Sequence, residues 1–108
     1  MPEQIINVIS DYGLPAYSDA KSGLYGFMKS ITRDMGARGI RVNTVSLGTV
    51  PHNGEIIEGN EYFEEKLKNI PTKEFVRPRH VAETLNSLVY VMTGIVGQNI
   101  ILDMGQSV

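Results

Sequence analysis

The chain has 108 residues, of which 42% are hydrophobic and 20% are charged, and its net charge at pH 7 is -2. This length suits one compact domain with a hydrophobic core and is too short for two domains. The nearly neutral, slightly acidic balance provides no electrostatic basis for a nucleic-acid surface. Because the sequence contains no cysteine, disulfides, thiolate metal sites and cysteine nucleophiles are excluded.

No segment is typical of a membrane span or a secretion signal. The apolar runs are far shorter than the ~20 residues that a span requires. The opening Met-Pro-Glu-Gln lacks the basic start of a signal peptide. We therefore expect a single cytoplasmic domain over residues 1–108, without membrane contact.

The first half of the chain predicts a strand, a long helix and a second strand. Residues 5–9 form a mostly β-branched run with apolar residues toward both faces, which indicates a buried strand. A second strand is expected from Ile40 to Val45, ending at Gly48. Between them, a helix is expected from about residue 16 to 37. Its apolar face, which should be buried, consists of Leu24, Phe27, Met28, Ile31 and Met35.

The second half predicts a long connection, a helix and a last strand. Residues 51–76 are polar and rich in turns, with a short amphipathic helix over 61–69, and long connections of this kind often act as lids or binding loops. Pro78 suits the first position of a helix, and residues 99–103 read as a strand. The expected buried stripe of that helix consists of Val81, Leu85, Leu88, Val89 and Met92.

Strands that alternate with helices predict an α/β fold, here a three-stranded parallel sheet with flanking helices. Adjacent right-handed crossovers would give the strand order 1-2-3 and would put both long helices on one face.

Tyr17 and Lys21 are candidates for proton-transfer chemistry. Residues four apart on a helix share a face, and a nearby ammonium favours the phenolate form of a tyrosine, which makes it a usable general acid or base. The spacing alone is weak evidence, because the pairs Tyr25/Lys29 and Tyr62/Lys66 share it. Tyr17 is preferred because it follows a strand and a turn, where it can face the carboxyl end of the sheet.

The segment Tyr-Ser-Asp-Ala-Lys-Ser-Gly-Leu at residues 17–24 resembles the active-site helix of the short-chain dehydrogenases/reductases. The similarity continues in order through residues 26–35, 39–45, 77–83 and 97–103, and so covers nearly the whole chain. It extends to the carboxyl half of that family only, because no glycine-rich dinucleotide fingerprint is present. The resemblance therefore implies a partial Rossmann-like sheet.

The resemblance implies specific roles and an NAD(P)-dependent oxidoreductase that interconverts a small-molecule carbonyl and an alcohol. Tyr17 would exchange a proton with the substrate oxygen, and Lys21 would hold the nicotinamide ribose of NAD or NADP. Ser10 would polarise the carbonyl. Val50, after Gly48-Thr49, matches the position whose backbone meets the nicotinamide carboxamide.

Several positions depart from the family pattern. Ser10 lies closer to Tyr17 than the family's serine does, so Asp11 is a second candidate, and both residues could instead cap a turn. Leu47 stands where the family has proline, and His52 stands where it has threonine. The family also puts its last helix on the opposite face of the sheet, against the right-handed rule.

These departures leave two alternatives to a complete enzyme: a non-catalytic remnant or assembly module, and a piece of a longer reductase. Without a phosphate-binding turn, we expect no tight NAD(P) binding by the 108 residues alone. His52 and His80 lack metal-ligand spacing, so no metal site is expected. Asn43 reads as a structural hydrogen-bonding residue.

A homo-oligomer is expected, most simply a homodimer. The first strand would expose an unpaired apolar edge, which can pair with another strand. The resemblance also implies packing through the tyrosine-bearing helix and the last strand.

Overall fold

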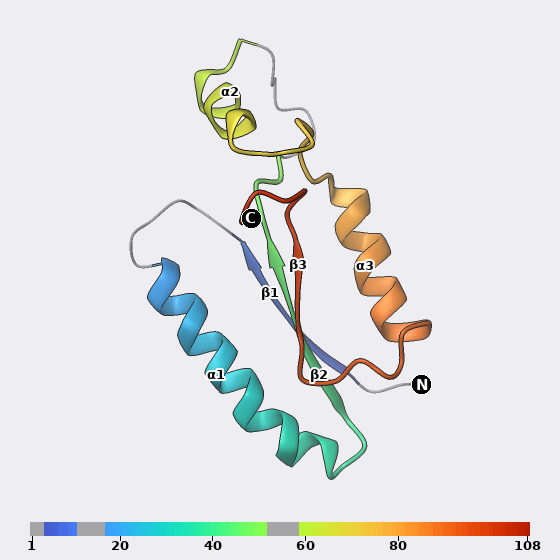
Figure 1. The fold of residues 1–108 in the computed structure, drawn as a ribbon. Helices are drawn as coiled ribbons and strands as arrows, with labels where there is room; N and C mark the ends of the chain where they lie inside the picture. Colours follow the sequence, from blue (N-terminus) through green and yellow to red (C-terminus); the bar gives the residue numbers. More distant parts are fainter. Residues whose placement is uncertain (1–3, 11–16, 52–58) are drawn as a thin grey trace.

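A computed structural model describes residues 4–10, 17–51 and 59–108, with the side chains of all of these except residues 9, 10 and 17–22. The order of elements is the one that the hydrophobic pattern predicts (Figure 1). The elements are β1 (Gln4–Ser10), α1 (Tyr17–Gly36), β2 (Arg41–Leu47), α2 (Glu61–Lys68), α3 (Pro78–Tyr90) and β3 (Asn99–Leu102). Each begins within two residues of its expected start, and α3 ends at Tyr90, before the Met92 that its expected stripe includes.

The three strands form one parallel sheet in the order β1-β2-β3, as predicted. Gln4 pairs with Arg41 at one end of the β1–β2 ladder, and Ser10 pairs with Leu47 at the other. Leu47 in turn pairs with Leu102 of β3. The central strand β2 is the most buried of the three, with Val42 and Val45 fully inaccessible to solvent. The sheet is therefore a partial Rossmann-like α/β structure.

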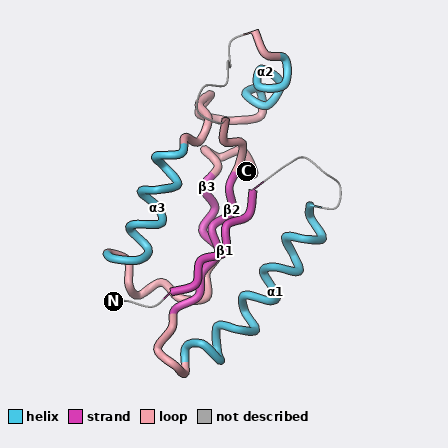
Figure 2. The backbone as a smooth tube through the Cα atoms, turned by 180° about the vertical axis from the view of Figure 1, so that it is seen from behind, coloured by secondary structure: helices cyan, strands magenta, loops and turns pink. Residues whose placement is uncertain are grey.

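The two long helices lie on opposite sides of this sheet, as the views from front and back agree (Figures 1 and 2). The sequence left two arrangements open, and the observed one is that implied by the family resemblance and not that of the right-handed rule. Because the strand order advances in one direction while the helices change sides, the two crossovers have opposite hands. Only one of them can follow the right-handed rule.

Side chains from the starts of β1 and β2 hold α3 on its side of the sheet. The Arg41 guanidinium donates to the carbonyl oxygens of Leu88 (2.9 Å) and Val89 (3.2 Å), near the end of α3. The Gln4 amide also donates to Leu88 O, at 3.1 Å. A cation at the carboxyl end of a helix complements its dipole and binds carbonyls that lack partners within the helix. These bonds stabilise α3 on its side of the sheet, although the two crossovers cannot both follow the right-handed rule.

Asn43 is a structural hydrogen-bonding residue, as expected. Its side chain is completely buried. Its Nδ2 donates to Gln4 Oε1 (2.9 Å) and Ile95 O (2.8 Å), while its Oδ1 accepts from Gln98 N at 3.0 Å. One buried amide thus joins β1, β2 and the connection between α3 and β3.

The expectation of a fully buried apolar face on α1 is wrong. Met28 is 0% exposed, but Leu24 is 39% and Phe27 is 56% exposed. The helix packs mainly over β2. Leu24 and Phe27 lie to the side of this contact, where the described residues leave them partly open to solvent. The expected burial of the first strand is wrong for the same reason, since Ile5 and Val8 at the edge of the sheet remain 39% and 50% exposed.

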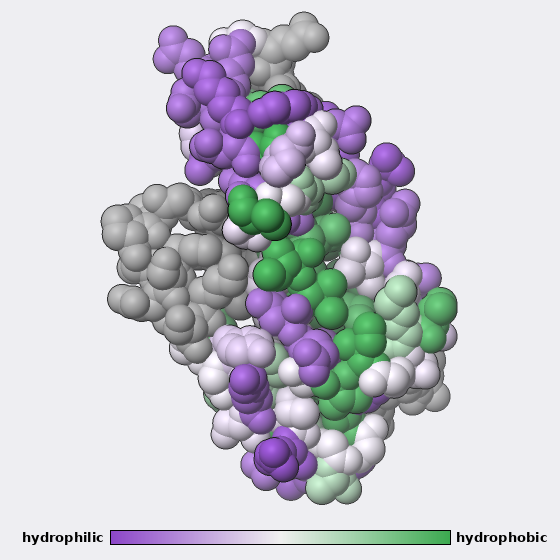
Figure 3. All heavy atoms as spheres, viewed as in Figure 1, coloured by the Kyte–Doolittle hydropathy of each residue, from purple (hydrophilic) through white to green (hydrophobic). Residues whose placement is uncertain are grey.

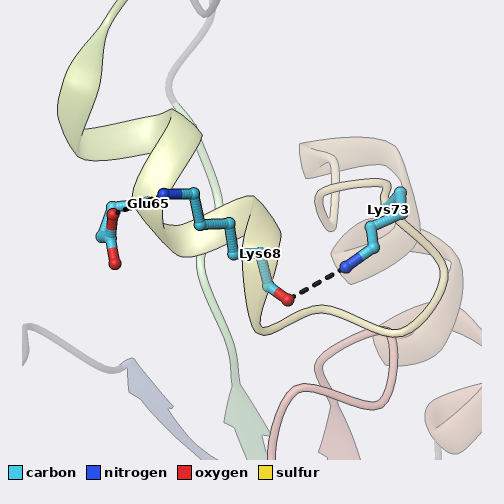
Figure 4. Close-up of polar contacts among 3 residues, drawn as sticks. All are labelled: Glu65, Lys68 and Lys73. Carbon is cyan, nitrogen blue, oxygen red and sulfur yellow. Dashed lines mark hydrogen bonds and ion pairs between the residues drawn. The ribbon is translucent and has the colours of Figure 1, made fainter.

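The described part of the long connection is an ordered helix with its own small core. Asn60 caps the start of α2 by accepting from Tyr62 N at 3.0 Å. At its other end, Lys73 Nζ donates to Lys68 O at 2.9 Å (Figure 4). Phe63, Ile70 and Phe75 pack together, with Leu67 and Met104 against them.

The predicted stripe of α3 is only partly buried. Leu88 is 2% exposed, whereas Met92 is 52% exposed because the helix ends at Tyr90 and Met92 lies in the turn that follows.

Candidate active site

The candidate residues gather where the three parallel strands end. Ser10, Leu47 and Leu102 pair across the sheet in one row, as the last residues of β1, β2 and β3. Gly48 and Asp103 follow directly on two of these strands. The arrowheads in Figure 1 point to this common edge, and α1 begins toward it. In open α/β sheets, ligands bind beyond the carboxyl ends of the strands.

Tyr17 and Lys21 are the first and fifth residues of α1, so their backbone positions lie one helical turn apart on one side of the helix. Their side chains lie outside the described part of the structure, as does that of Ser10. Asp11 and His52 fall outside the described residues altogether. The joint action of Tyr17, Lys21 and Ser10 therefore stays a prediction.

The two competing Tyr-x-x-x-Lys pairs have a different geometry from that of a lysine-activated phenol. The Nζ atom of Lys29 lies 4.5 Å from the centroid of the Tyr25 ring, and that of Lys66 lies 5.6 Å from the centroid of Tyr62. Each ammonium therefore sits over the ring face, in a cation–π contact. Tyr62 is also 54% exposed on α2. We therefore assign both pairs to cation–π contacts and not to proton transfer.

The segment that follows β2 approaches the end of β3 closely. Gly48 N donates to Leu102 O at 3.1 Å. A Cβ atom at residue 48 would lie 2.7 Å from Asp103 Cβ, so only glycine fits without displacing the backbone of the neighbouring turn. Thr49 N donates to Gln106 Oε1 at 3.1 Å, and Thr49 is 7% exposed. Val50, which follows, is half-buried.

Sequence reasoning missed Gln106. The Asp-x-Gly pattern at residues 103–105 is a turn signal, since a short polar side chain can bind the backbone two residues on. That signal could have predicted the turn. It could not have predicted the bond to Thr49, which lies 57 positions earlier in the chain.

The described part of the structure also has a groove on the α3 side of the sheet. This groove of about 280 Å³ runs between α3 and β3, lined by Glu83, Thr84, Ser87, Leu88, Met92, Ile95 and Ile100. Figure 3 shows an apolar strip along the same face. Exposed apolar residues in and near β3 include Met92, Val96 and Ile101. Because Ile100 pairs with Val45 inside the sheet, the groove is separate from the carboxyl edge.

The part of the chain that the structure describes contains no group of three histidine, aspartate or glutamate side chains that could hold a metal ion. None of its helices is both long enough and apolar enough to cross a membrane. His80 instead accepts from Arg77 N through Nδ1 at 2.9 Å, at the start of α3.

Comparison with known proteins decides the family. The family model described as enoyl-(acyl carrier protein) reductase matches residues 4–107. The chain belongs to the short-chain dehydrogenase/reductase family. The resemblance that begins at residues 17–24 is thereby confirmed over nearly the whole chain.

The relatives are reductases and are much longer than this chain. The 3-oxoacyl-[acyl-carrier-protein] reductase FabG of Buchnera aphidicola is 35% identical over 81 residues, which cover 75% of this chain and 33% of that protein. Carbonyl reductase family member 4 of Danio rerio is 31% identical over 101 residues, covering 94% of this chain and 41% of that protein. The chain thus spans well under half the length of these relatives.

The fold is shared with solved short-chain dehydrogenases. One from Burkholderia cenocepacia, solved in complex with NADP, superposes with a TM-score of 0.83 at 23% identity. The match covers 97% of this chain and 46% of that one. The described sheet and helices therefore correspond to a part of the short-chain dehydrogenase/reductase fold.

Proposed function

We propose that this chain is the proton-transferring part of a short-chain dehydrogenase/reductase that interconverts a carbonyl and a hydroxyl on a small molecule with NAD or NADP. The observation that carries this proposal is the start of α1. Tyr17 and Lys21 occupy adjacent turns of one helix face there, at the edge where β1 and β2 end. Family membership supports the same reaction class.

In the reducing direction, Tyr17 donates its phenolic proton to the carbonyl oxygen, and the resulting phenolate is reprotonated from solvent. The Lys21 ammonium favours the phenolate, which lowers the barrier to that transfer. Ser10 donates a hydrogen bond to the same oxygen, a role that Asp11 fills only with its carboxyl group protonated. When bound, the reduced nicotinamide of NADH or NADPH would supply the hydride to the carbonyl carbon and become oxidised.

The residues at the carboxyl edge fit the nicotinamide end of such a cofactor. Gly48 and Thr49 already have their amides bound within the protein, to Leu102 O and Gln106 Oε1, so the backbone leading to Val50 has a defined course. Val50 would meet the carboxamide and Lys21 the ribose. The sequence holds no glycine-rich turn for the pyrophosphate, so residues outside this chain would hold that end.

The test is an NMR titration of the 108-residue chain with nicotinamide mononucleotide, which carries only the end of the cofactor that these residues fit. We expect weak, saturable shifts at Gly48, Thr49 and Val50. Lys21→Ala should remove them. Lys29→Ala is the matched control, because Lys29 lies on the same helix and its Nζ atom lies over the Tyr25 ring. Absent shifts in the unaltered chain, or equal shifts in both variants, would refute the proposal and favour a non-catalytic module.

We also propose that the chain self-associates as a homo-oligomer. Exposed apolar side chains on β1 and α1 support this proposal, since Val8 is 50% and Phe27 is 56% exposed. Both β1 and β3 end the described sheet without a neighbouring strand on one side. An unpaired edge with apolar side chains favours pairing with a second chain.

A further inference from the structure

Several hydrogen bonds hold the last turn of the described chain. Asp103 Oδ1 accepts from Gly105 N at 2.9 Å, and Asp103 Oδ2 accepts from Ser107 N at 3.0 Å. Gln106 N donates to Asp103 O at 3.1 Å. Met104 and Gly105 both have positive φ angles, of 56° and 83°. One carboxylate thus binds two amides of the turn and fixes where the Gln106 side chain leaves the backbone.

This turn contacts the segment after β2 at two successive residues. Gly48 lies against Asp103, where a Cβ atom would come within 2.7 Å of Asp103 Cβ. Gln106 Oε1 accepts from Thr49 N at 3.1 Å in a site where Thr49 is 7% exposed. A buried amide that loses its acceptor is unfavourable unless the segment moves to find water. The side chain of Gln106 therefore restrains the course of residues 48–50.

The same turn also contacts the connection that carries α2. Met104 packs against the cluster of Phe63, Ile70 and Phe75. A Cβ atom at Gly105 would lie 3.2 Å from Pro71 Cγ. Residues 103–107 therefore lie between the α2 connection and the backbone after β2.

We propose that Gln106 is a positioning residue that holds the Thr49–Val50 backbone at the carboxyl edge of the sheet in the conformation that receives the nicotinamide. The assignment of nicotinamide as the ligand rests on the proposed function. The holding of Thr49 by Gln106 does not, because it follows from the bond between Thr49 N and Gln106 Oε1 alone.

The test compares Gln106→Met, which keeps the length of the side chain and removes the acceptor oxygen, with Gln106→Glu, which keeps an acceptor. Gln98→Met is the matched control, because the Gln98 side chain is exposed and donates only to Val96 O. Amide hydrogen exchange at Thr49 is measured in each protein, with Val45 in the core of β2 as the internal reference. Each protein is then titrated with nicotinamide mononucleotide.

We expect Gln106→Met to speed exchange at Thr49 by ~10-fold, the effect of one lost hydrogen bond, and to leave Val45 unchanged. It should also weaken nucleotide binding, while Gln106→Glu and Gln98→Met behave like the unaltered chain. Unchanged exchange at Thr49 would overturn the proposal. Equal acceleration at Thr49 and Val45 would also overturn it, because it would show a general loss of stability.

The two proposals can fail separately. Suppose that the unaltered chain shows no response to the nucleotide while Gln106→Met still speeds amide exchange at Thr49 and not at Val45. In that case the proposed function fails and the holding role of Gln106 stands. If the nucleotide binds equally well to the unaltered chain and to Gln106→Met, the positioning role fails and the proposed function stands.

Discussion

At the scale of single residues, three tyrosines share the same spacing to a lysine, and their surroundings separate them. Tyr25 and Tyr62 have the lysine over the ring face. Tyr17 alone begins a helix beside the ends of the strands. The position of a Tyr-x-x-x-Lys pair in the fold, and not its spacing alone, therefore indicates whether it can act in proton transfer.

Replacing Tyr17 by phenylalanine removes the transferable proton and keeps the ring. In an assembly that has reductase activity, we expect turnover to fall by ~10²–10⁴-fold, the usual size of a general acid/base contribution. Steady-state kinetics of carbonyl reduction measures this. Tyr25→Phe and Tyr62→Phe should change turnover little. Loss of turnover in Tyr25→Phe but not in Tyr17→Phe would show that the wrong pair had been chosen.

Gly48→Ala should destabilise the protein. The added Cβ would lie 2.7 Å from Asp103 Cβ and 3.0 Å from Asp103 Cα. Overpacking of this kind lowers the free energy of unfolding by about 1–3 kcal/mol, measured by urea unfolding. Gly26→Ala is the control, because a Cβ there meets nothing within 4 Å inside α1. That change should raise stability by about 0.5–1 kcal/mol. Equal stability of the two variants would contradict the close approach at Gly48.

At the scale of elements, the sequence predicts the helix α1 correctly, but not the burial of its apolar face. The apolar spacing predicted the helix well, since the structure has it over Tyr17–Gly36. The same spacing predicted equal burial for Phe27 and Met28, yet Phe27 is 56% and Met28 is 0% exposed. A periodic pattern defines a stripe, but the width that is covered depends on what packs against it.

Met28→Ala and Phe27→Ala should therefore differ sharply. Met28→Ala leaves a cavity against the sheet and should lower the free energy of unfolding by about 2–5 kcal/mol. Phe27→Ala removes a larger side chain from the surface and should change it by only about 0.5 kcal/mol in the monomer. Thermal unfolding at low protein concentration tests both. A larger loss for Phe27→Ala would mean that α1 is rotated relative to the described packing.

At the scale of the whole molecule, the described chain is elongated, with extents of 50 × 29 × 22 Å, and both outer strands bear exposed apolar side chains. Light scattering at micromolar concentration should give about twice the 11.9 kDa of the single chain. A mass equal to that of one chain would refute self-association.

The contact used for association can be located with two lysine variants. Val8→Lys should weaken a dimer that pairs through β1, and Phe27→Lys should weaken one that packs through α1. Both positions are at least half exposed, so the folded monomer should tolerate either change better than a change at half-buried Ile6. Light scattering of both variants tests this, and an unchanged dimer mass in both would exclude β1 and α1 as the contact.

The amino-acid sequence by itself determined the order and type of the elements, the parallel α/β class and the family, because periodicity, turn residues and motifs are local properties of the chain. Only the tertiary structure decided the side on which α3 lies, the exposure of Phe27 and the bond between Gln106 and Thr49. Each of these depends on groups far apart in the sequence. Arg41 reaches Leu88 across 47 residues, and Gln106 reaches Thr49 across 57. Such contacts form only once the chain has folded, and no periodic pattern in the sequence predicts them.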